Sequence, residues 1–229
     1  MARGLMFMAH YNYGKSIDNA STIGGGAQVV VQDDHNFRAE RGLSSFDVRH
    51  SLRTNYFYEL PFGERKKWAR KGWTARAFGN WQMSGGVTVS SGTPFTARVL
   101  GGTPDNSGTG GFSQRADQIG DPNLSSGDRD PLHFFNTSAF ILPPAGEFGN
   151  AARNTITGPG SFQMNFALNR GIRFGKDGQR RVDLRWEVNN LTNTPNFTGL
   201  STVVNSTTFG RVTGSRPMRT MEFQMRVNF

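Results

Sequence analysis

The 229-residue sequence contains no cysteine. A disulfide framework, a thiolate metal site and a cysteine nucleophile are therefore excluded. The sequence also lacks a run of the roughly 20 apolar residues that a membrane-spanning helix needs. Its first stretch, MARGLMFMAHYNYG, has too short an apolar run for a secretory signal. These absences predict either a cytosolic protein or an incomplete chain.

Metal-binding and catalytic patterns are also scarce. The four histidines are scattered without metal-ligand spacing, and no serine sits in a nucleophile elbow. The loop GDPNLSSGDRD offers oxygen ligands, but its glycine is displaced from the EF-hand position and no bidentate Glu closes it. Its oxygen-bearing residues are Asp121, Asn123, Ser125, Asp128 and Asp130. We expect a turn-rich external loop here, and no catalytic residues, cofactor or metal.

Period-two alternation is abundant, and it predicts an all-β, antiparallel fold. Six segments place apolar and polar residues on opposite faces, which is typical of strands. They are residues 4–13, 48–60, 80–90, 161–169, 181–189 and 221–229. Met6, Met8, His50 and Phe57 blur this pattern. A soluble sheet also alternates, so alternation alone does not decide between a membrane barrel and a sandwich.

The connections and the charges favour a transmembrane barrel. Long and short connections alternate along the chain, as they do when one end of a barrel carries loops and the other carries turns. Several segments reach the 9–11 residues that a tilted strand needs to cross a bilayer, whereas ordinary strands average about 5–6. Charged residues fall almost entirely on one parity. We therefore predict a partial barrel of about six long strands with long external loops.

Five long segments resemble the C-terminal barrel part of TonB-dependent outer-membrane receptors of the Oar-like kind. They are AERGLSSFDVRHSLRTNYFYELPFG, GNWQMSGGVTVSSGTPF, IGDPNLSSGDRDPLHFFNTSAF, GEFGNAARNTITGPGSFQMNFALNR and EVNNLTNTPNF. The resemblance covers nearly the whole chain and implies a large barrel of roughly 22 strands with a plugged lumen. A signal peptide, an N-terminal domain and the plug would precede it. We therefore expect residues 1–229 to be a C-terminal portion of such a receptor in the bacterial outer membrane.

The resemblance also implies partners. In barrels of this kind, a last strand that ends in an aromatic residue is read by the barrel-assembly machinery. In this sequence that signal corresponds to Phe223, Met225, Val227 and Phe229. The other implied partners are outer-membrane lipid, the rest of the barrel, the plug and, only through the N-terminal part, the TonB system. Loops 92–160 and 192–218 would face the substrate, and this portion would not transport anything alone.

Two other functions stay open. One is a porin-like or adhesive surface protein made of several copies. The other is a soluble basic β-protein that binds nucleic acid, since the net charge is +9. That charge concentrates in residues 61–79, where Trp68 and Trp73 lie among cations. We interpret this segment as a periplasmic turn at the membrane interface, with its cations near lipid phosphates, and expect no nucleic-acid partner.

Overall fold

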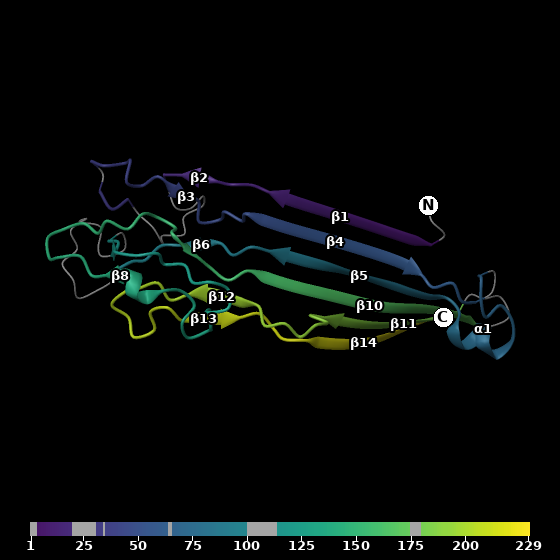
Figure 1. The fold of residues 1–229 in the computed structure, drawn as a ribbon. Helices are drawn as coiled ribbons and strands as arrows, with labels where there is room; N and C mark the ends of the chain where they lie inside the picture. The colour runs from purple at the N-terminus through teal and green to yellow at the C-terminus, as the bar shows by residue number, and fades with distance from the viewer. Residues whose placement is uncertain (1–3, 20–30, 34, 64–65, 100–113, 175–179) are drawn as a thin grey trace.

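The structure is a computed structural model that describes residues 4–19, 31–33, 35–63, 66–99, 114–174 and 180–229. Its main feature is one antiparallel sheet of six strands in the order β1-β4-β5-β10-β11-β14 (Figure 1). The strands are β1 (Leu5–Tyr13), β4 (His50–Glu59), β5 (Trp81–Ser90), β10 (Ser161–Phe174), β11 (Arg180–Asn189) and β14 (Thr220–Asn228). Each long strand pairs with the next long strand along the chain. The six predicted strands are confirmed, and we call this sheet the wall.

The register of the wall places most of the apolar residues of the six strands on one face. Residues directly opposite each other share a face, and a slip of one residue would turn a strand over. One row crosses the wall with an apolar or aromatic residue on every strand: Leu5, Tyr58, Met83, Leu168, Trp186 and Phe223. The alternation in the sequence therefore becomes one continuous apolar face.

The opposite face of the wall is polar and charged. A neighbouring row runs through Glu59, Gln82, Asn169, Arg185 and Gln224. Ion pairs follow β11 on this face, with Arg181 Nε 2.5 Å from an Asp183 carboxylate oxygen and Arg185 2.8 Å from Glu187. The residues that blurred the pattern near one edge are apolar exceptions on this face, since Met6 lies opposite Phe57.

The glycine pair of β5 is accommodated by its neighbours. Gly85 lies opposite Tyr56, and a Cβ at Gly85 would stand 2.7 Å from the Tyr56 hydroxyl oxygen. The Tyr56 ring therefore occupies the surface that a side chain at this position would cover. An aromatic residue across from a glycine preserves the contacts that a strand glycine otherwise forgoes.

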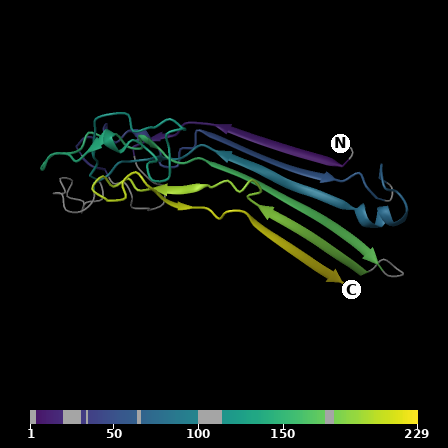
Figure 2. The same ribbon diagram turned by 60° about the horizontal axis from the view of Figure 1, so that its bottom comes forward.

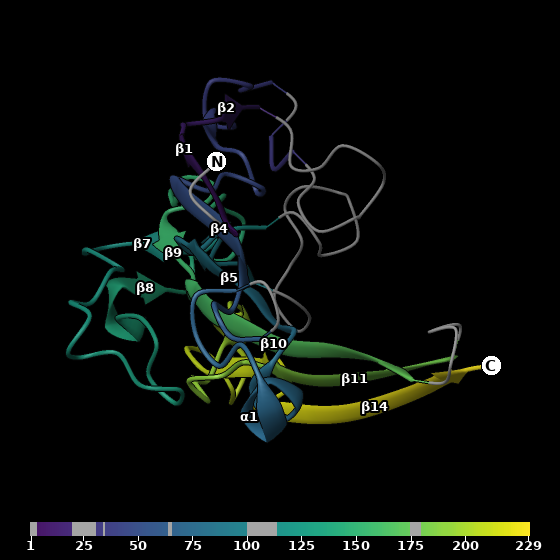
Figure 3. The ribbon, with the colours of Figure 1, turned by 90° about the vertical axis from the view of Figure 1, so that its right-hand side faces the viewer.

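The two ends of the wall differ. The connections 14–49, 91–160 and 190–219 leave from one end, which we call the loop end. The other end, the turn end, carries the connection 60–80 and both chain termini (Figures 1 and 2). Viewed from the turn end, the six strands follow an arc that stays open, with β1 and β14 at its two ends (Figure 3). The predicted alternation of long and short connections is confirmed.

At the loop end, the described residues of 14–49, 91–160 and 190–219 pack into one body, the outer lobe. It contains the hairpin β12 (Phe197–Leu200) with β13 (Val212–Ser215), and several two-residue strands. These are β2 (Ile17–Asp18), β3 (Gly42–Leu43), β6 (Pro94–Phe95), β7 (Asp117–Gln118), β8 (Phe140–Ile141) and β9 (Ile156–Thr157), with the 3-10 turn η1 (Thr137–Ala139) before β8.

The outer lobe has a hydrophobic core of its own. Phe135 is 2% exposed and meets Phe209 and Phe140 edge to face, at ring-centroid distances of 5.2 and 6.3 Å. Ile156 and Val99 are buried beside them. Edge-to-face pairs of this kind add about 0.5–1.5 kcal/mol each beyond area burial. Segments that the sequence predicted only as external loops therefore form a packed structure.

At the turn end, the connection 60–80 contains a short helix, α1 (Gly72–Phe78), where the sequence predicted a turn. A helix of this length is not stable by itself in water. The side chains of Trp81 and Arg170 hold it by donating hydrogen bonds to the carbonyl oxygens of Ala77 and Arg76. The wall therefore supplies the contacts that fix α1.

Candidate functional site: the wall and the outer lobe

The apolar face of the wall is exposed. Its side chains are widely exposed, reaching 80% for Phe223 and 63% for Phe7. Soluble monomers rarely expose continuous apolar patches of more than a few hundred Å². Among the described strands, the charged residues on this face are Arg170 and Arg180, and both lie near the turn end. A cation at mid-bilayer would cost about 2–4 kcal/mol, so their placement near the rim fits a membrane.

Aromatic residues stand at both ends of this face. Tyr11 and Tyr13 lie at the loop end, where the Tyr11 hydroxyl is 2.8 Å from His50 Nδ1. Trp81 lies at the turn end, with the Arg170 guanidinium 5.3 Å from its ring centroid. Aromatic residues are enriched where a barrel surface meets the headgroups. The wall therefore has the banding of a membrane-spanning sheet.

The polar face of the wall suits a water-filled interior. Its Arg and Asp or Glu side chains pair along β11, and charges are tolerated where water reaches them. Glu187 and Glu222 lie opposite each other, an arrangement that a dry interior would penalise. Arg185 compensates through its 2.8 Å contact with Glu187. The two faces of one sheet therefore have different solvents.

The outer lobe contains a buried ion pair. Arg115 Nη1 lies 2.8 Å from Glu40 Oε2, and the two side chains are 2% and 1% exposed. Gln32 closes the arrangement: its backbone N–H donates to Glu40, its side-chain oxygen accepts from the Arg115 backbone N–H, and its amide donates to the Gly149 carbonyl. The hydrogen bonds from Gln32 each join a side chain to a backbone group. This arrangement ties the connection 14–49 to the connection 91–160.

A second guanidinium joins the same two connections. Arg153 donates to the Glu40 carbonyl oxygen at 2.6 Å and to Asp18 Oδ1 at 2.7 Å. Asn154 adds a hydrogen bond to the Leu43 carbonyl. The sequence analysis missed Glu40, Arg115 and Arg153, because a charged residue in a loop gives no local signal that it will be buried. Burial also lowers the pKa of the neighbouring Arg98.

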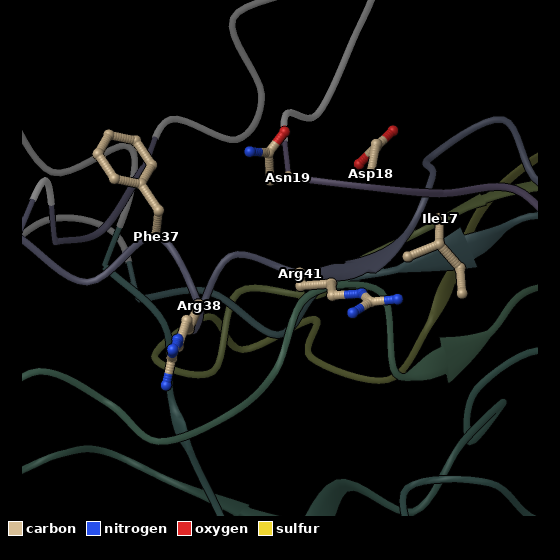
Figure 4. A pocket seen from close by; sticks show the side chains of 6 residues that line it. All are labelled: Ile17, Asp18, Asn19, Phe37, Arg38 and Arg41. Carbon is tan, nitrogen blue, oxygen red and sulfur yellow. The ribbon is translucent and has the colours of Figure 1, made fainter.

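The outer lobe has an open hollow near β2. It has a volume of about 420 Å³ and is lined by Ile17, Asp18, Asn19, Phe37, Arg38 and Arg41 (Figure 4). The side chains of Phe37, Arg38 and Arg41 point in different directions in Figure 4. Polar groups that fix a ligand have to converge on it. The hollow therefore lacks the convergent geometry of a built binding site.

The acidic loop is held by its own hydrogen bonds. Asp121 accepts from the backbone of Asn123, and Ser125 donates to Asp128 at 2.6 Å. Asp130 accepts from the backbone N–H groups of Leu132 and His133, and these hydrogen bonds lower the pKa of the Asp130 carboxyl. The carboxylates thus act as turn-forming acceptors. In the described part of the chain, no group of three or more His, Asp or Glu residues could hold a metal ion.

The predicted assembly-signal residues lie on β14 or directly after it. Phe223, Met225 and Val227 project from its apolar face with exposures of 80%, 71% and 37%, and Phe229 follows the strand with 93%. The ring of Phe223 stacks on Trp186 at 5.8 Å. One side of β14 has no paired strand among the described residues. Their role as a signal stays a prediction.

The comparisons with known proteins agree with this geometry. Neither the search of curated proteins nor the search of solved structures returned a match to the chain. None of the helices in the described residues has the length and apolar character needed to cross a membrane. One family model, described as an outer membrane beta barrel domain, matches residues 1–222. The chain therefore belongs to this family of outer-membrane β-barrels and lies in the bacterial outer membrane.

Proposed function

We propose that the wall is part of the barrel of a TonB-dependent receptor of the Oar-like kind, a transporter that takes up a scarce nutrient or large substrate. The observation that carries this proposal is the open arc of Figure 3, in which β1 and β14 each keep one edge unpaired among the described residues. Open edges do not persist in lipid, and the smallest single-chain barrels have eight strands. The wall would therefore continue into further strands of a wide barrel.

The polar face supports a wide barrel of this kind. Its long charged side chains, such as Arg185 and Arg226, need a lumen broad enough for water or for a polar plug. In this proposal the plug and the remaining strands contact the wall, and the TonB system acts through the plug. No catalytic step belongs to this function. The sequence motifs of the Oar-like receptors supply the finer assignment.

The outer lobe would form part of the substrate-facing surface. Three long connections contribute to it, and external loops that fold into a rigid body can present a fixed surface to a ligand. The segment Arg98–Val99 joins two of these connections, since the Arg98 backbone N–H donates to the Thr202 carbonyl oxygen at 2.9 Å. The substrate would first meet this lobe.

The proposal is tested by growth and by conductance. A strain that lacks the gene and a strain that lacks TonB should lose growth on the same limiting nutrient when both are screened against one panel. The full-length protein in a planar bilayer should show no steady conductance, because a plug fills the lumen. Growth defects that never coincide, together with a steady open pore, would contradict the receptor function.

A second candidate is an oligomeric porin-like protein, and the edge strands favour it. β1 runs from the turn end to the loop end and β14 runs back, and both have nine residues. β14 of one copy could therefore pair antiparallel with β1 of the next. A discrete multimer of this chain in detergent, with steady conductance, would select this candidate over the receptor. The soluble nucleic-acid-binding alternative loses support, because the apolar face needs lipid.

A further inference from the structure

Several guanidinium groups gather beside α1 at the turn end. Arg76 of α1, Arg170 and Arg173 of β10 and Arg181 of β11 line one cavity of about 770 Å³. Asp183 neutralises Arg181 at 2.5 Å. The side chains of Arg76 and Arg173 have no hydrogen-bond or ion-pair partner among the described residues. The cavity therefore contains positive charge that the described part of the chain does not balance.

The cavity exists because β10 is longer than its neighbour β5. The last residue pair between them is Arg170 with Trp81, and β10 continues to Phe174. The helix α1 stands beside this extension, held by the hydrogen bonds from Trp81 and Arg170. Both of these side chains belong to the apolar face of the wall, whereas Arg173 lies opposite Arg181 and belongs with it to the polar face. The cavity thus lies at the rim of the turn end, where both faces of the wall end.

Exposed aromatic rings stand beside these cations. Trp73 is 73% exposed and Phe78 is 54% exposed, and their ring centroids are 6.4 Å apart. Large rings exposed to water are unfavourable, but at a membrane interface they lie between headgroups and acyl chains. Lys71 precedes α1 and adds another cation. The segment thus combines exposed aromatic rings with positive charge at the turn end of the wall.

We propose that this cavity binds the phosphate of an anionic phospholipid headgroup, with Arg76 and Arg173 as its ligands and with Trp73 and Phe78 inserted into the interface. The planar guanidinium fork donates two parallel hydrogen bonds to phosphate oxygens, which a lysine cannot reproduce. Membrane lipid is the source of the phosphate because the exposed rings adjoin the cations. The site anchors the turn end, and this role does not depend on which substrate the protein takes up.

The test uses the full-length protein in nanodiscs of phosphatidylcholine with a minor share of phosphatidylglycerol. Native mass spectrometry counts the phosphatidylglycerol molecules that remain bound after detergent release. The double variant Arg76→Gln/Arg173→Gln should retain several-fold less phosphatidylglycerol than the parent. The control Arg38→Gln/Arg41→Gln makes the same charge change in the outer lobe and should retain the parental amount. The variant Arg76→Lys/Arg173→Lys should retain an intermediate amount.

Equal losses in the two glutamine double variants would overturn the site, because they would indicate attraction to the overall charge. Inorganic phosphate that displaced phosphatidylglycerol at comparable concentration would identify free phosphate as the ligand and would overturn the lipid. A second measurement avoids the arginine variants altogether. Brominated phosphatidylglycerol should quench the tryptophan fluorescence of the parent more than that of the variant Trp73→Phe. Equal quenching of the two proteins would contradict insertion of α1.

Discussion

The wall and the outer lobe are built on opposite plans. The wall contains the six long strands, yet its buried hydrophobic residues are only Ala167 and Val188 among the described residues. The outer lobe has mostly two-residue strands, yet it contains nearly all of the hydrophobic core, including Phe135, Phe140 and Ile156. The regular strands and the hydrophobic core therefore lie in different regions of the molecule, although their segments alternate in the sequence.

The difference follows from the solvent of each region. In lipid there is no water to bond the backbone, so the wall must satisfy its N–H and C=O groups in ladders, and its apolar side chains face outward. The outer lobe folds in water, where burial of apolar area stabilises at about 25 cal/mol per Å². It can then leave the backbone irregular if side chains such as Gln32 and Asn154 supply hydrogen bonds. One chain therefore follows two sets of packing rules.

The largest expected effect is a loss of stability in the outer lobe that leaves the wall folded. Replacing Glu40 with Ala leaves the guanidinium of Arg115 buried without its partner, and breaking a buried pair costs about 3–5 kcal/mol. Hydrogen exchange should accelerate in the outer lobe, for example at the Ala116 amide that donates to Ala97. The heat-induced gel shift that reports the folded barrel should stay unchanged.

The control for this prediction replaces both partners. Because well-packed apolar residues can substitute for a buried ion pair at little cost, Glu40→Leu with Arg115→Met should recover most of the lost protection. Slow exchange retained in Glu40→Ala alone would show that the pair contributes nothing to the lobe. Loss of the gel shift in that variant would show that the lobe and the wall fold as one unit.

The next largest effect is a loss of stability in the wall that leaves the outer lobe intact. Val87 lies on the apolar face of β5, opposite Thr54 and Met164. Val87→Arg should lower the free energy of unfolding in phospholipid vesicles by about 2–4 kcal/mol, because the cation faces lipid. Gln82→Arg places the same charge on the polar face of the same strand, opposite Glu59, and should cost well under this amount. Equal costs would contradict the assignment of the two faces.

The wall could be predicted from the sequence because the alternation of a strand is visible within a few consecutive residues. A strand has period two, so residues such as Val182, Leu184 and Trp186 reveal their shared face without knowledge of their neighbours. The pattern also restricts the register, since a slip of one residue would turn a strand over and move its apolar residues to the other face. Even the residues that blurred the pattern were informative, because Met6 and Phe57 lie opposite each other on the polar face.

The outer lobe could not be predicted because its contacts are distant. Glu40 and Arg115 are 75 residues apart, and Arg153 meets a carbonyl 113 residues away. The fixed spacing that reveals a strand or a helix does not exist for such pairs. The same holds for α1, whose seven residues depend on Arg170 from another strand. The motifs quoted in the sequence analysis include Glu40 and Arg153, but neither Arg115 nor α1.

A smaller effect concerns the aromatic packing on the lipid face. Trp186 stacks on Phe223 with the ring planes 6° apart, and Phe166 meets Trp186 edge-on at 5.8 Å. Phe223→Leu keeps an apolar side chain in lipid but removes a ring pair. It should therefore lower the free energy of unfolding by about 0.5–1.5 kcal/mol. Met225→Leu on the same strand is the control, with less change. A double-mutant cycle with Trp186→Leu measures the coupling, and a coupling of zero would show that the rings contribute only area.

The smallest thermodynamic effect is expected at Phe229, although its cellular effect should be large. The Phe229 side chain is 93% exposed, so Phe229→Ser removes few contacts and should leave the unfolding free energy of the folded barrel within about 0.5 kcal/mol of the parent. If the barrel-assembly machinery reads this residue, the amount of full-length protein in the outer membrane should nevertheless fall severalfold. Phe37→Ser, which removes an exposed ring from the outer lobe, controls for the loss of a ring. An unchanged outer-membrane level in Phe229→Ser would remove the assembly signal from this strand and leave Phe229 as one more lipid-facing ring at the rim.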